Sequence, residues 1–520
     1  MDLTLLLVCF LHVVLAIDDE LFSGPSDEEW NPNKINLPDS HMTRYLNAFP
    51  EEAKKCQNSS HCISKNIIGT GLCWGYEQNC PSHLSYSQPV CNGDHRGWVQ
   101  TKEAQVESFY KQADFGYVKD HINGMKVICQ PETTNDTLLE CSPKLQFCRA
   151  SNLFIDFSDL AKRKEPFRYK MDVLKHGQIG GRCKLNVKQL NDEATHMSPL
   201  QSWAPEMQNL IELQDYPCDI TFTRPTFIMK IDASVNMYHH FCDFFNLYAS
   251  LHVNGTHENM FSKDIQIIIW ETFSYYSNFK ATFDAFTSHP ILDLKHLSGK
   301  RVCFKNVVFP LLPRMVFGLY YNTPIVWGCE NSGLFHAFSK FILHRLDIPR
   351  RVFQETPAIK ITFLARQTQY RRVLNEEQLL DALRSNKHYI VQRVEFTHST
   401  DFVEQLKIIH DSDILIGMHG AGLTHSLFLP DWAAVFELYN CEDVHCYSDL
   451  ARLRGVQYFT WVDRSKLQQE NEGHHPSGGP HAKFTNYAFD VDEFVRIVDA
   501  AADHVRRHEQ YQRLHPKDEL

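Results

Sequence analysis

Short β-branched runs alternate with stretches of helical periodicity in the second half of the chain, and no other feature constrains the fold as strongly. The runs predict strands at 359–364, 389–394, 413–417, 433–438 and 456–461, with helices at 375–383 and 400–409. Strands and helices that alternate in this way form a mainly parallel sheet. The ligand crevice of such a Rossmann-like unit lies at the carboxyl ends of its strands.

A similar alternation begins earlier, with predicted strands at 226–231, 265–270 and 302–309. We therefore expect the α/β fold class, with one α/β lobe over 221–355 and a second over 356–490. A C-terminal helix is predicted over 491–516, where one apolar stripe is formed by Phe494, Ile497, Val498 and Val505.

Cysteines gather in the first part of the chain, where ten of the 16 lie between Cys56 and Cys218. None of them has the two-residue spacing that is typical of a zinc knuckle or a redox pair. We therefore interpret residues 17–220 as an irregular region stapled by disulfides, and we favour this interpretation over metal binding. Cys9 lies in the apolar run at the start of the sequence and is left out of the pairing. Because the other 15 cysteines are an odd number, at least one of them has no disulfide partner within the chain.

The two ends of the sequence carry address signals. An apolar run from Leu3 to Ala16 is shorter than the ~20 residues of a membrane helix, and residues 1–16 are predicted to be a signal peptide. The last four residues, Lys517, Asp518, Glu519 and Leu520, match the retrieval signal that a receptor reads on lumenal proteins. We expect localisation to the endoplasmic reticulum lumen, with no membrane span.

Composition excludes one class of partner. The chain has 520 residues, a net charge of −11 and no long basic run, whereas binding to nucleic acid requires clustered Lys and Arg. Three acceptor sequons predict N-glycans at Asn58, Asn135 and Asn254.

A glycine-rich turn follows the predicted strand 413–417. It contains His419, Gly420, Ala421 and Gly422, and it leads into a probable helix whose first N–H groups could bind a diphosphate. Glycines that merely allow tight strand-to-helix packing explain the pattern about as well. Glu437 ends the next strand, where its carboxylate could accept hydrogen bonds from ribose hydroxyls.

Arginines follow the predicted strand 359–364. Arg366, Arg371 and Arg372 are therefore expected at the same carboxyl edge as the glycine turn. Guanidinium groups there could neutralise a leaving diphosphate, whereas an isolated pair would more often lie in a solvated loop. The shared edge favours binding.

A third candidate cluster lies at 238–246. If this segment is helical, His239, Asp243 and Asn246 share one face. An imidazole or carboxylate there could take a proton from an attacking hydroxyl, or the carboxylate could help to hold a cation. A buried hydrogen-bond network is about equally compatible with the spacing.

Signatures of several other enzyme classes are missing from the sequence. It has no Cys-x-x-Cys redox pair, nucleophile elbow, Gly-x-x-x-x-Gly-Lys phosphate loop or His-Glu-x-x-His zinc site. Among the enzyme classes considered, transfer of a sugar from a soluble nucleotide-sugar is the one that remains.

Three separated motifs, at 239–246, 366–375 and 417–423, resemble glycosyltransferase family 61. This family includes plant xylosyl- and arabinosyltransferases and two animal O-GlcNAc-type enzymes of the endoplasmic reticulum. The resemblance implies an inverting transferase with two Rossmann-like, GT-B-like lobes. It further implies UDP-N-acetylglucosamine as donor and Ser or Thr hydroxyls of folded EGF-like domains as acceptors.

The family's short acidic motif falls on Asp243, Phe244 and Phe245. The motif supplies only one carboxylate, which does not favour a metal-binding role for it. A divalent cation such as manganese is expected to assist the reaction, with no protein ligands assigned. In the implied mechanism Gly420 to Gly422, Arg366 and Arg371 stabilise the diphosphate, and Glu437 holds the ribose. His239 and Asp243 are exchangeable candidates for base and substrate positioner.

Two alternatives remain open from the sequence. One is the same chemistry on O-mannose of a dystroglycan-type glycoprotein, which the retrieval signal and the Cys-rich region disfavour. The other is a noncatalytic lumenal lectin or chaperone, which the intact Arg366, Gly420, Gly422 and Asp243 disfavour.

Overall fold

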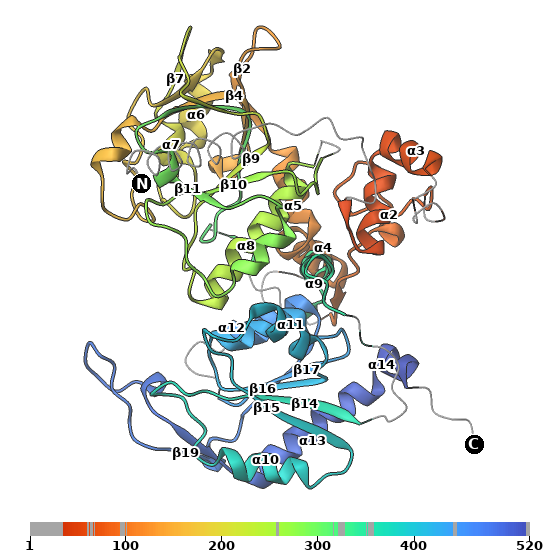
Figure 1. Ribbon diagram of the computed structural model, residues 1–520. Coiled ribbons are helices and arrows are strands. Elements are labelled where there is room, and N and C mark those ends of the chain that lie inside the picture. The colour runs from red at the N-terminus through yellow and green to blue at the C-terminus, as the bar shows by residue number, and fades with distance from the viewer. Residues whose placement is uncertain are drawn as a thin grey trace, which may run out of the picture. The chain divides into compact units, whose positions relative to one another are not determined.

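The computed structural model describes residues 35–515 except 60–61, 63–65, 67, 94–98, 100, 256–258, 316, 321–327, 350, 352–357 and 440–444 (Figure 1). The predicted signal peptide 1–16 and retrieval signal 517–520 lie outside these residues. Within the described ranges, no helix is both long enough and apolar enough to cross a bilayer. The fold is mixed α/β, and the chain divides into two compact units.

The described residues of the first unit lie within 35–80, 116–235 and 242–320. In its described part, an 11-stranded sheet is the central element, and its main path runs β11 (Leu292–Asp293), β10 (Gln266–Ile269), β9 (Thr226–Met229), β12 (Arg301–Phe309), β4 (Cys148–Asp156), β3 (Leu138–Cys141), β2 (Lys126–Gln130) and β6 (Lys184–Leu185). Three further strands pair beside this path: β5 (Ile179–Gly181), β7 (Leu210–Glu212) and β8 (Ile220–Phe222).

This sheet is parallel on one side and antiparallel on the other. Strands β9, β10 and β11 are parallel, and β12 is parallel to β8 and β9. From β12 onward, β4, β3, β2 and β6 are antiparallel. The Cys-rich segment therefore supplies regular strands to the same sheet as the predicted α/β segment, because hairpins such as β3–β4 can extend a parallel sheet at its edge.

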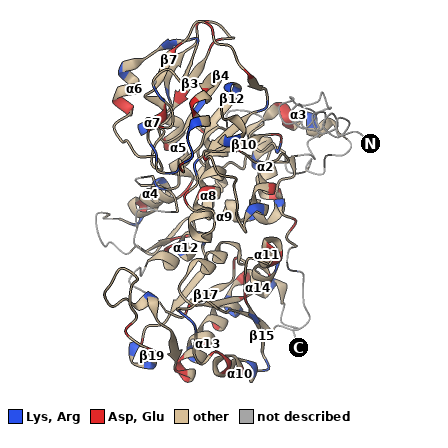
Figure 2. Ribbon diagram, turned by 60° about the vertical axis from the view of Figure 1, so that its left-hand side comes forward, with Lys and Arg blue, Asp and Glu red and all other residues tan. Residues whose placement is uncertain are grey.

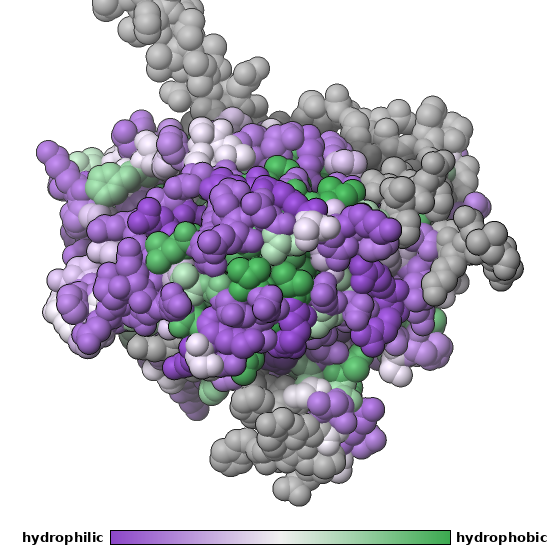
Figure 3. All heavy atoms as spheres, turned by 90° about the horizontal axis from the view of Figure 1, so that it is seen from below, coloured by the Kyte–Doolittle hydropathy of each residue, from purple (hydrophilic) through white to green (hydrophobic). Residues whose placement is uncertain are grey.

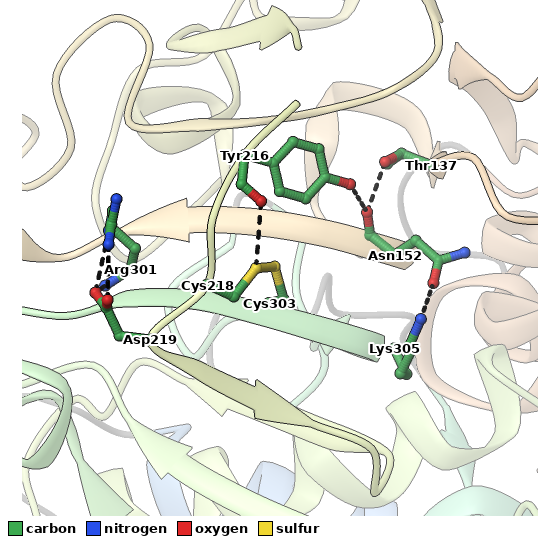
Figure 4. Close-up of a disulfide and its surroundings, with 8 residues drawn as sticks. All are labelled: Thr137, Asn152, Tyr216, Cys218, Asp219, Arg301, Cys303 and Lys305. Atoms are coloured by element: carbon green, nitrogen blue, oxygen red, sulfur yellow. Dashed lines mark hydrogen bonds and ion pairs between the residues drawn. A yellow bond between two sulfur atoms is a disulfide. The ribbon is translucent and has the colours of Figure 1, made fainter. Parts of the chain in front are cut away.

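Six disulfides join cysteines that the structure describes. They are Cys56–Cys62, Cys73–Cys80, Cys91–Cys329, Cys129–Cys183, Cys141–Cys148 and Cys218–Cys303. Figure 4 shows Cys218–Cys303, which ties the segment before β8 to β12, beside the ion pair of Asp219 and Arg301 (2.8 Å). The predicted disulfide framework is confirmed.

The helices of the first unit are α2 (Asp39–Ala48), α3 (Pro50–Asn58), α6 (Val187–Glu193) and α7 (Ala204–Met207), together with most of α5 (Phe115–Asn123) and α8 (Met237–Val253). The α8 helix is buried over most of its length, and polar contacts join it to the N-terminal segment. His41 Nε2 lies 2.7 Å from the Tyr248 hydroxyl, and the Tyr76 hydroxyl lies 3.1 Å from His252 Nδ1.

The second unit contains a five-stranded parallel sheet. Its order is β15 (Tyr389–Val394), β14 (Ile359–Leu364), β16 (Ile414–Gly417), β17 (Ala434–Glu437) and β18 (Gln457–Thr460). Its helices include α9 (Gly333–Arg345), α10 (Glu376–Arg384), α11 (Phe402–His410), α12 (Cys446–Arg454), α13 (Val491–Arg507) and α14 (Glu509–Leu514), and β19 (Leu467–Gln469) pairs with β20 (Tyr487–Phe489). All five predicted strands are confirmed to within a residue or so at each end.

Local capping explains two helix starts in this unit. The Asp401 carboxylate accepts hydrogen bonds at the start of α11, and the Asp490 carboxylate accepts from Glu493 N–H at the start of α13. The predicted apolar stripe of α13 packs on the sheet, but the helix ends at Arg507 because His508 is extended. The single C-terminal helix predicted over 491–516 is therefore two helices, α13 and α14.

An N-terminal segment, 81–115, belongs to the second unit. The strand β1 (Val90–Cys91) pairs with β13 (Cys329–Glu330), and the Cys91–Cys329 disulfide lies in this pair. After α4 (Lys102–Ala113), the Asp114 carboxylate accepts from the N–H groups of Gly333 and Leu334 (2.9 Å each) at the start of α9. The boundaries predicted at 220 and 355 lie where the composition of the sequence changes. The contacts of the 81–115 segment do not follow such changes, because they join segments that are far apart in sequence.

Acidic and basic residues are interspersed along the ribbon in both units (Figure 2). The face shown in Figure 3 is mostly hydrophilic, with a small apolar patch within it. Of the predicted glycan sites, Asn58 and Asn135 are exposed and Asn254 is half-buried. Ser60 and Thr256 of their sequons lie outside the described residues.

The disulfides make a testable contribution to stability. Removal of Cys218–Cys303 by paired Cys→Ser substitutions is expected to cost about 4–5 kcal/mol, because the bond closes a long loop, with a sequence separation of 85. Removal of Cys141–Cys148, with a separation of 7 in the same sheet, is expected to cost only about 2 kcal/mol. Urea unfolding under non-reducing conditions measures both, and equal losses would contradict the loop-closure account.

Candidate active site

The glycine turn lies at the carboxyl end of β16 and packs closely on β14. A Cβ atom on Gly420 would lie 2.4 Å from Arg366 Nη1, and one on Gly422 would lie 2.8 Å from Leu364 Cδ2. The turn leads into the predicted helix, which is the 3₁₀ helix η8 (Ala421–Phe428). Close packing therefore requires the two glycines. At the start of η8, backbone N–H groups have no partner inside the helix, so they suit an anion.

Two guanidinium groups meet at this turn. Arg366 Nε donates to Thr368 Oγ1 (2.6 Å) and to the Tyr370 carbonyl (3.1 Å). Arg371 Nη1 donates to the His419 carbonyl (2.9 Å). Burial, together with the Arg371 charge, lowers the pKa of Arg366 to about 10. Two like charges held side by side favour a bound anion that would neutralise both.

Arg371 owes its position to the backbone. It adopts a left-handed conformation (φ 61°), and its N–H donates to the Thr485 carbonyl (2.7 Å), close to β20. The next residue, Arg372, has an exposed side chain, and its N–H donates to Asn486 Oδ1. Of the three arginines after β14, the structure therefore brings Arg366 and Arg371 to the glycine turn.

Glu437 lies behind the turn at the end of β17 and is buried. Its Oε1 lies 2.5 Å from His419 Nδ1, and its Oε2 accepts from the Tyr458 hydroxyl (2.5 Å). Burial and the adjacent Glu437 carboxylate raise the pKa of the Tyr458 phenol. Both carboxylate oxygens therefore fix the orientation of neighbouring rings. The ribose contact of Glu437 stays a prediction.

A cavity of about 420 Å³ opens beside the turn, within the volume range of small-molecule sites. Its lining comes from the loops after β14 and β15 and from the turn, and includes Arg366, Gln367, Thr368, Glu395, Phe396, Thr397, His398, Met418 and Gly422. Sequence reasoning missed the 395–398 segment because it has no glycine pattern or like-charge cluster. Its place directly after the predicted strand 389–394 was the available signal.

The acidic motif lies on α8, as its helical spacing predicted. Asp243 is buried, and its carboxylate accepts from the Asp232 N–H (3.1 and 3.3 Å). Asn246 Nδ2 donates to the Leu312 carbonyl (3.1 Å). Phe244 and Phe245 are fully buried, and Phe244 meets Phe283 edge-on. The motif thus anchors loops and core packing.

His239 lies one helical turn before Asp243 and is partly exposed. Its ring contacts that of Tyr238 edge-on, with centroids 5.7 Å apart. The catalytic roles predicted for His239 and Asp243 stay predictions, as do those of the residues at the glycine turn.

The carboxylates of Asp243 on α8 and of Asp232 in the loop before it do not fit a cation site. Asp243 accepts a backbone N–H, and Asp232 forms an ion pair with Arg314 (2.9 Å). Elsewhere in the described ranges, Cys73, Glu77 and Cys80 lie close enough together for a metal, but their two sulfur atoms form a disulfide. A thiolate is required for metal binding, so this cluster does not fit one either.

Comparison with known proteins gives this arrangement its class. Residues 237–436, which contain the α8 motif, both arginines and the glycine turn, match the family Glycosyltransferase 61. The chain belongs to this family of glycosyltransferases. The family predicted from the three sequence motifs is confirmed.

Particular relatives are similar over nearly the whole chain. The EGF domain-specific O-linked N-acetylglucosamine transferase of Drosophila melanogaster is 52% identical over 515 residues, which cover 98% of this chain and 96% of the relative. The proteins of the same name from Pan troglodytes and Mus musculus are 47% and 45% identical, and each match covers 96% of this chain and 95% of the relative.

The close contact at Gly420 can be tested directly. Gly420→Ala is expected to weaken pyrophosphate binding about tenfold, or about 1.4 kcal/mol, because the new methyl group displaces the Arg366 guanidinium. The unfolding temperature is expected to fall as well, because the backbone of Gly420 (φ 158°) has a conformation that residues with a Cβ atom rarely adopt, so binding is measured well below the unfolding transition of the variant. Calorimetric titration and thermal unfolding measure the two effects. Unchanged pyrophosphate affinity would show that Arg366 does not bind the anion from this position.

Proposed function

We propose that this protein transfers N-acetylglucosamine from UDP-N-acetylglucosamine to Ser or Thr hydroxyls of folded EGF-like domains, as in Notch-type receptors. The observation that carries the proposal is the pair of partly buried guanidinium groups on the glycine turn, in a chain of this glycosyltransferase family. The name that its relatives share, EGF domain-specific O-linked N-acetylglucosamine transferase, supports the acceptor class.

The donor occupies the carboxyl edge of β14, β15 and β16. Arg366, Arg371 and the first N–H groups of η8 receive the diphosphate, which gains one negative charge as it leaves. The half-buried Phe396 offers a face for the uracil base, and Glu395, in the same cavity, accepts from ribose hydroxyls. Glu437 supports the donor through the orientation of His419.

The reaction is a single inverting displacement. The acceptor oxygen forms a bond to the anomeric carbon while the bond to the diphosphate breaks, and its electron pair passes to the diphosphate oxygen. We assign proton removal to the partly exposed His239. The buried Asp243 is a positioning residue, because its carboxylate holds the loop at Asp232 that leads into α8.

The two units take different parts in this proposal. We assign the donor to the second unit, whose sheet is parallel as in a Rossmann-like lobe, and the acceptor to the first unit, whose described sheet is parallel from β11 to β12 and antiparallel from β12 to β6. Manganese or another divalent cation would be bound through the diphosphate of the donor, which is itself an oxygen ligand. No step depends on that cation.

Six disulfides support an oxidising compartment, and we assign the protein to the endoplasmic reticulum lumen. Retrieval by a receptor that reads residues 517–520 completes this part of the proposal.

The test is transfer of labelled sugar from UDP-N-acetylglucosamine to a folded EGF-like domain. Arg366→Gln is expected to lower kcat/KM at least a hundredfold, about 2.7 kcal/mol, because the leaving diphosphate loses a charged donor. Arg384→Gln, an exposed arginine on α10 in the same unit, serves as the control and is expected to leave transfer unchanged.

Absence of transfer by the wild-type protein, with pyrophosphate binding intact, would refute the acceptor class and favour an O-mannosyl acceptor or a binding role. Equal losses in Arg366→Gln and Arg384→Gln would refute the assignment of the donor site. Thermal unfolding with saturating UDP distinguishes a wrong acceptor from a wrong donor site. If the donor site is correct, UDP is expected to raise the unfolding temperature of the wild type and of Arg384→Gln, but not of Arg366→Gln.

A further inference from the structure

A second cavity lies in the first unit, at the carboxyl ends of the parallel neighbours β9 and β10. It measures about 490 Å³ and is lined by three segments, 166–169, 230–235 and 269–276. The edge of an open α/β sheet at which strands end is where ligands bind. Neither the sequence motifs nor the donor site uses this cavity.

The rim of the cavity is unusually apolar for a protein surface. Among the described residues, three of the four highly exposed aromatic side chains line it: Tyr169, Phe273 and Tyr276 are 62%, 52% and 65% exposed. Val235, which is 69% exposed, lies on the same rim, and the Arg168 guanidinium lies over the Tyr169 ring (5.9 Å). Clustered Tyr, Phe and Arg side chains are typical of surfaces that bind other proteins.

The floor of the cavity is rigid and its charges are compensated. Lys230 Nζ donates to both carboxylate oxygens of Glu206 (2.8 Å each) and lies over the Trp203 ring (4.4 Å). The Glu271 carboxylate accepts from the N–H groups of Phe167 and Arg168, which holds the 166–169 segment in place. The floor offers no unpaired charge to a sugar diphosphate, and Arg168 is the cation left at the rim.

The cavity is continuous with the family's acidic motif. The segment 230–235, which forms one wall of the cavity, includes Asp232, whose backbone N–H donates to the Asp243 carboxylate. Ser277 Oγ donates to the Ser234 carbonyl (2.6 Å), which joins the 269–276 wall to the same loop. Burial, and the nearby Asp243 carboxylate, raise the pKa of the Tyr275 phenol.

We infer that this aromatic-rimmed cavity is the docking surface for the body of the acceptor domain, away from the hydroxyl that reacts. The inference rests on the proposed function. A small disulfide-rich domain buries little of its apolar surface, so it can present an apolar side chain to the cavity. An acidic side chain beside it would pair with Arg168. The cavity thus selects a folded domain in place of a free hydroxyl-bearing peptide.

The experiment measures steady-state transfer to one folded EGF-like domain and to the same domain after reduction and alkylation. The variants are Phe273→Ser and Tyr276→Ser, whose exposed side chains are not needed for folding. Both are expected to raise KM for the folded domain at least tenfold, with KM for UDP-N-acetylglucosamine unchanged. Val187→Ser, an exposed apolar residue on α6 in the same unit, is the control and is expected to leave both values unchanged.

Three results would overturn the docking surface. One is an unchanged KM for the folded domain in both variants, and another is an equal rise in Val187→Ser. The third is loss of self-association on gel filtration without a change in KM, which would make the rim a contact between copies of this chain. Failure of the proposed function is distinguishable, because the wild type would then transfer nothing although it binds UDP.

Discussion

The packing of two guanidinium groups against one glycine is the contact on which the candidate site depends. Arg366 and Arg371 lie at Gly420 because β14 and β16 are parallel neighbours whose carboxyl ends meet at the same edge. Like charges so close, one of them buried enough to lower its pKa to about 10, cost free energy in the absence of an anion. The same arrangement is therefore ready for a diphosphate, and the chain's membership in a glycosyltransferase family gives that anion a chemical identity.

Support for this contact comes from parts of the chain that are distant in sequence. The Thr485 carbonyl holds the backbone N–H of Arg371, and elsewhere in the same unit Asp114 attaches the 81–115 segment to the start of α9, while the Cys91–Cys329 disulfide attaches it to β13. Glu437, between His419 and Tyr458, fixes the ring that follows β16. Polar groups in this unit thus hold one another in place around a sheet whose core is apolar.

Much of the second unit could be predicted from the sequence, because β-branched runs and capped helices carry local signals. The strand 359–364 followed from its run of β-branched and apolar residues. The proximity of Arg366 to Gly420 followed from the parallel direction of the two strands that precede them. The 395–398 wall of the cavity could not be recognised, since its residues carry no motif. Two further features could not be predicted from the sequence: the break at His508 between α13 and α14, and the placement of segment 81–115 in the second unit. Tertiary contacts determine both. The pairing of Glu437 with His419 depends on register between β16 and β17, which composition does not encode.

Hydrogen–deuterium exchange of the full chain with and without saturating UDP tests the donor site most directly, because the nucleotide is expected to cover backbone amides at the carboxyl edge of the sheet. The account predicts slower exchange confined to residues 366–371, 395–398 and 418–423, with the amides of the first unit's 269–276 loop unchanged. Slower exchange elsewhere, with these three segments unaffected, would contradict it.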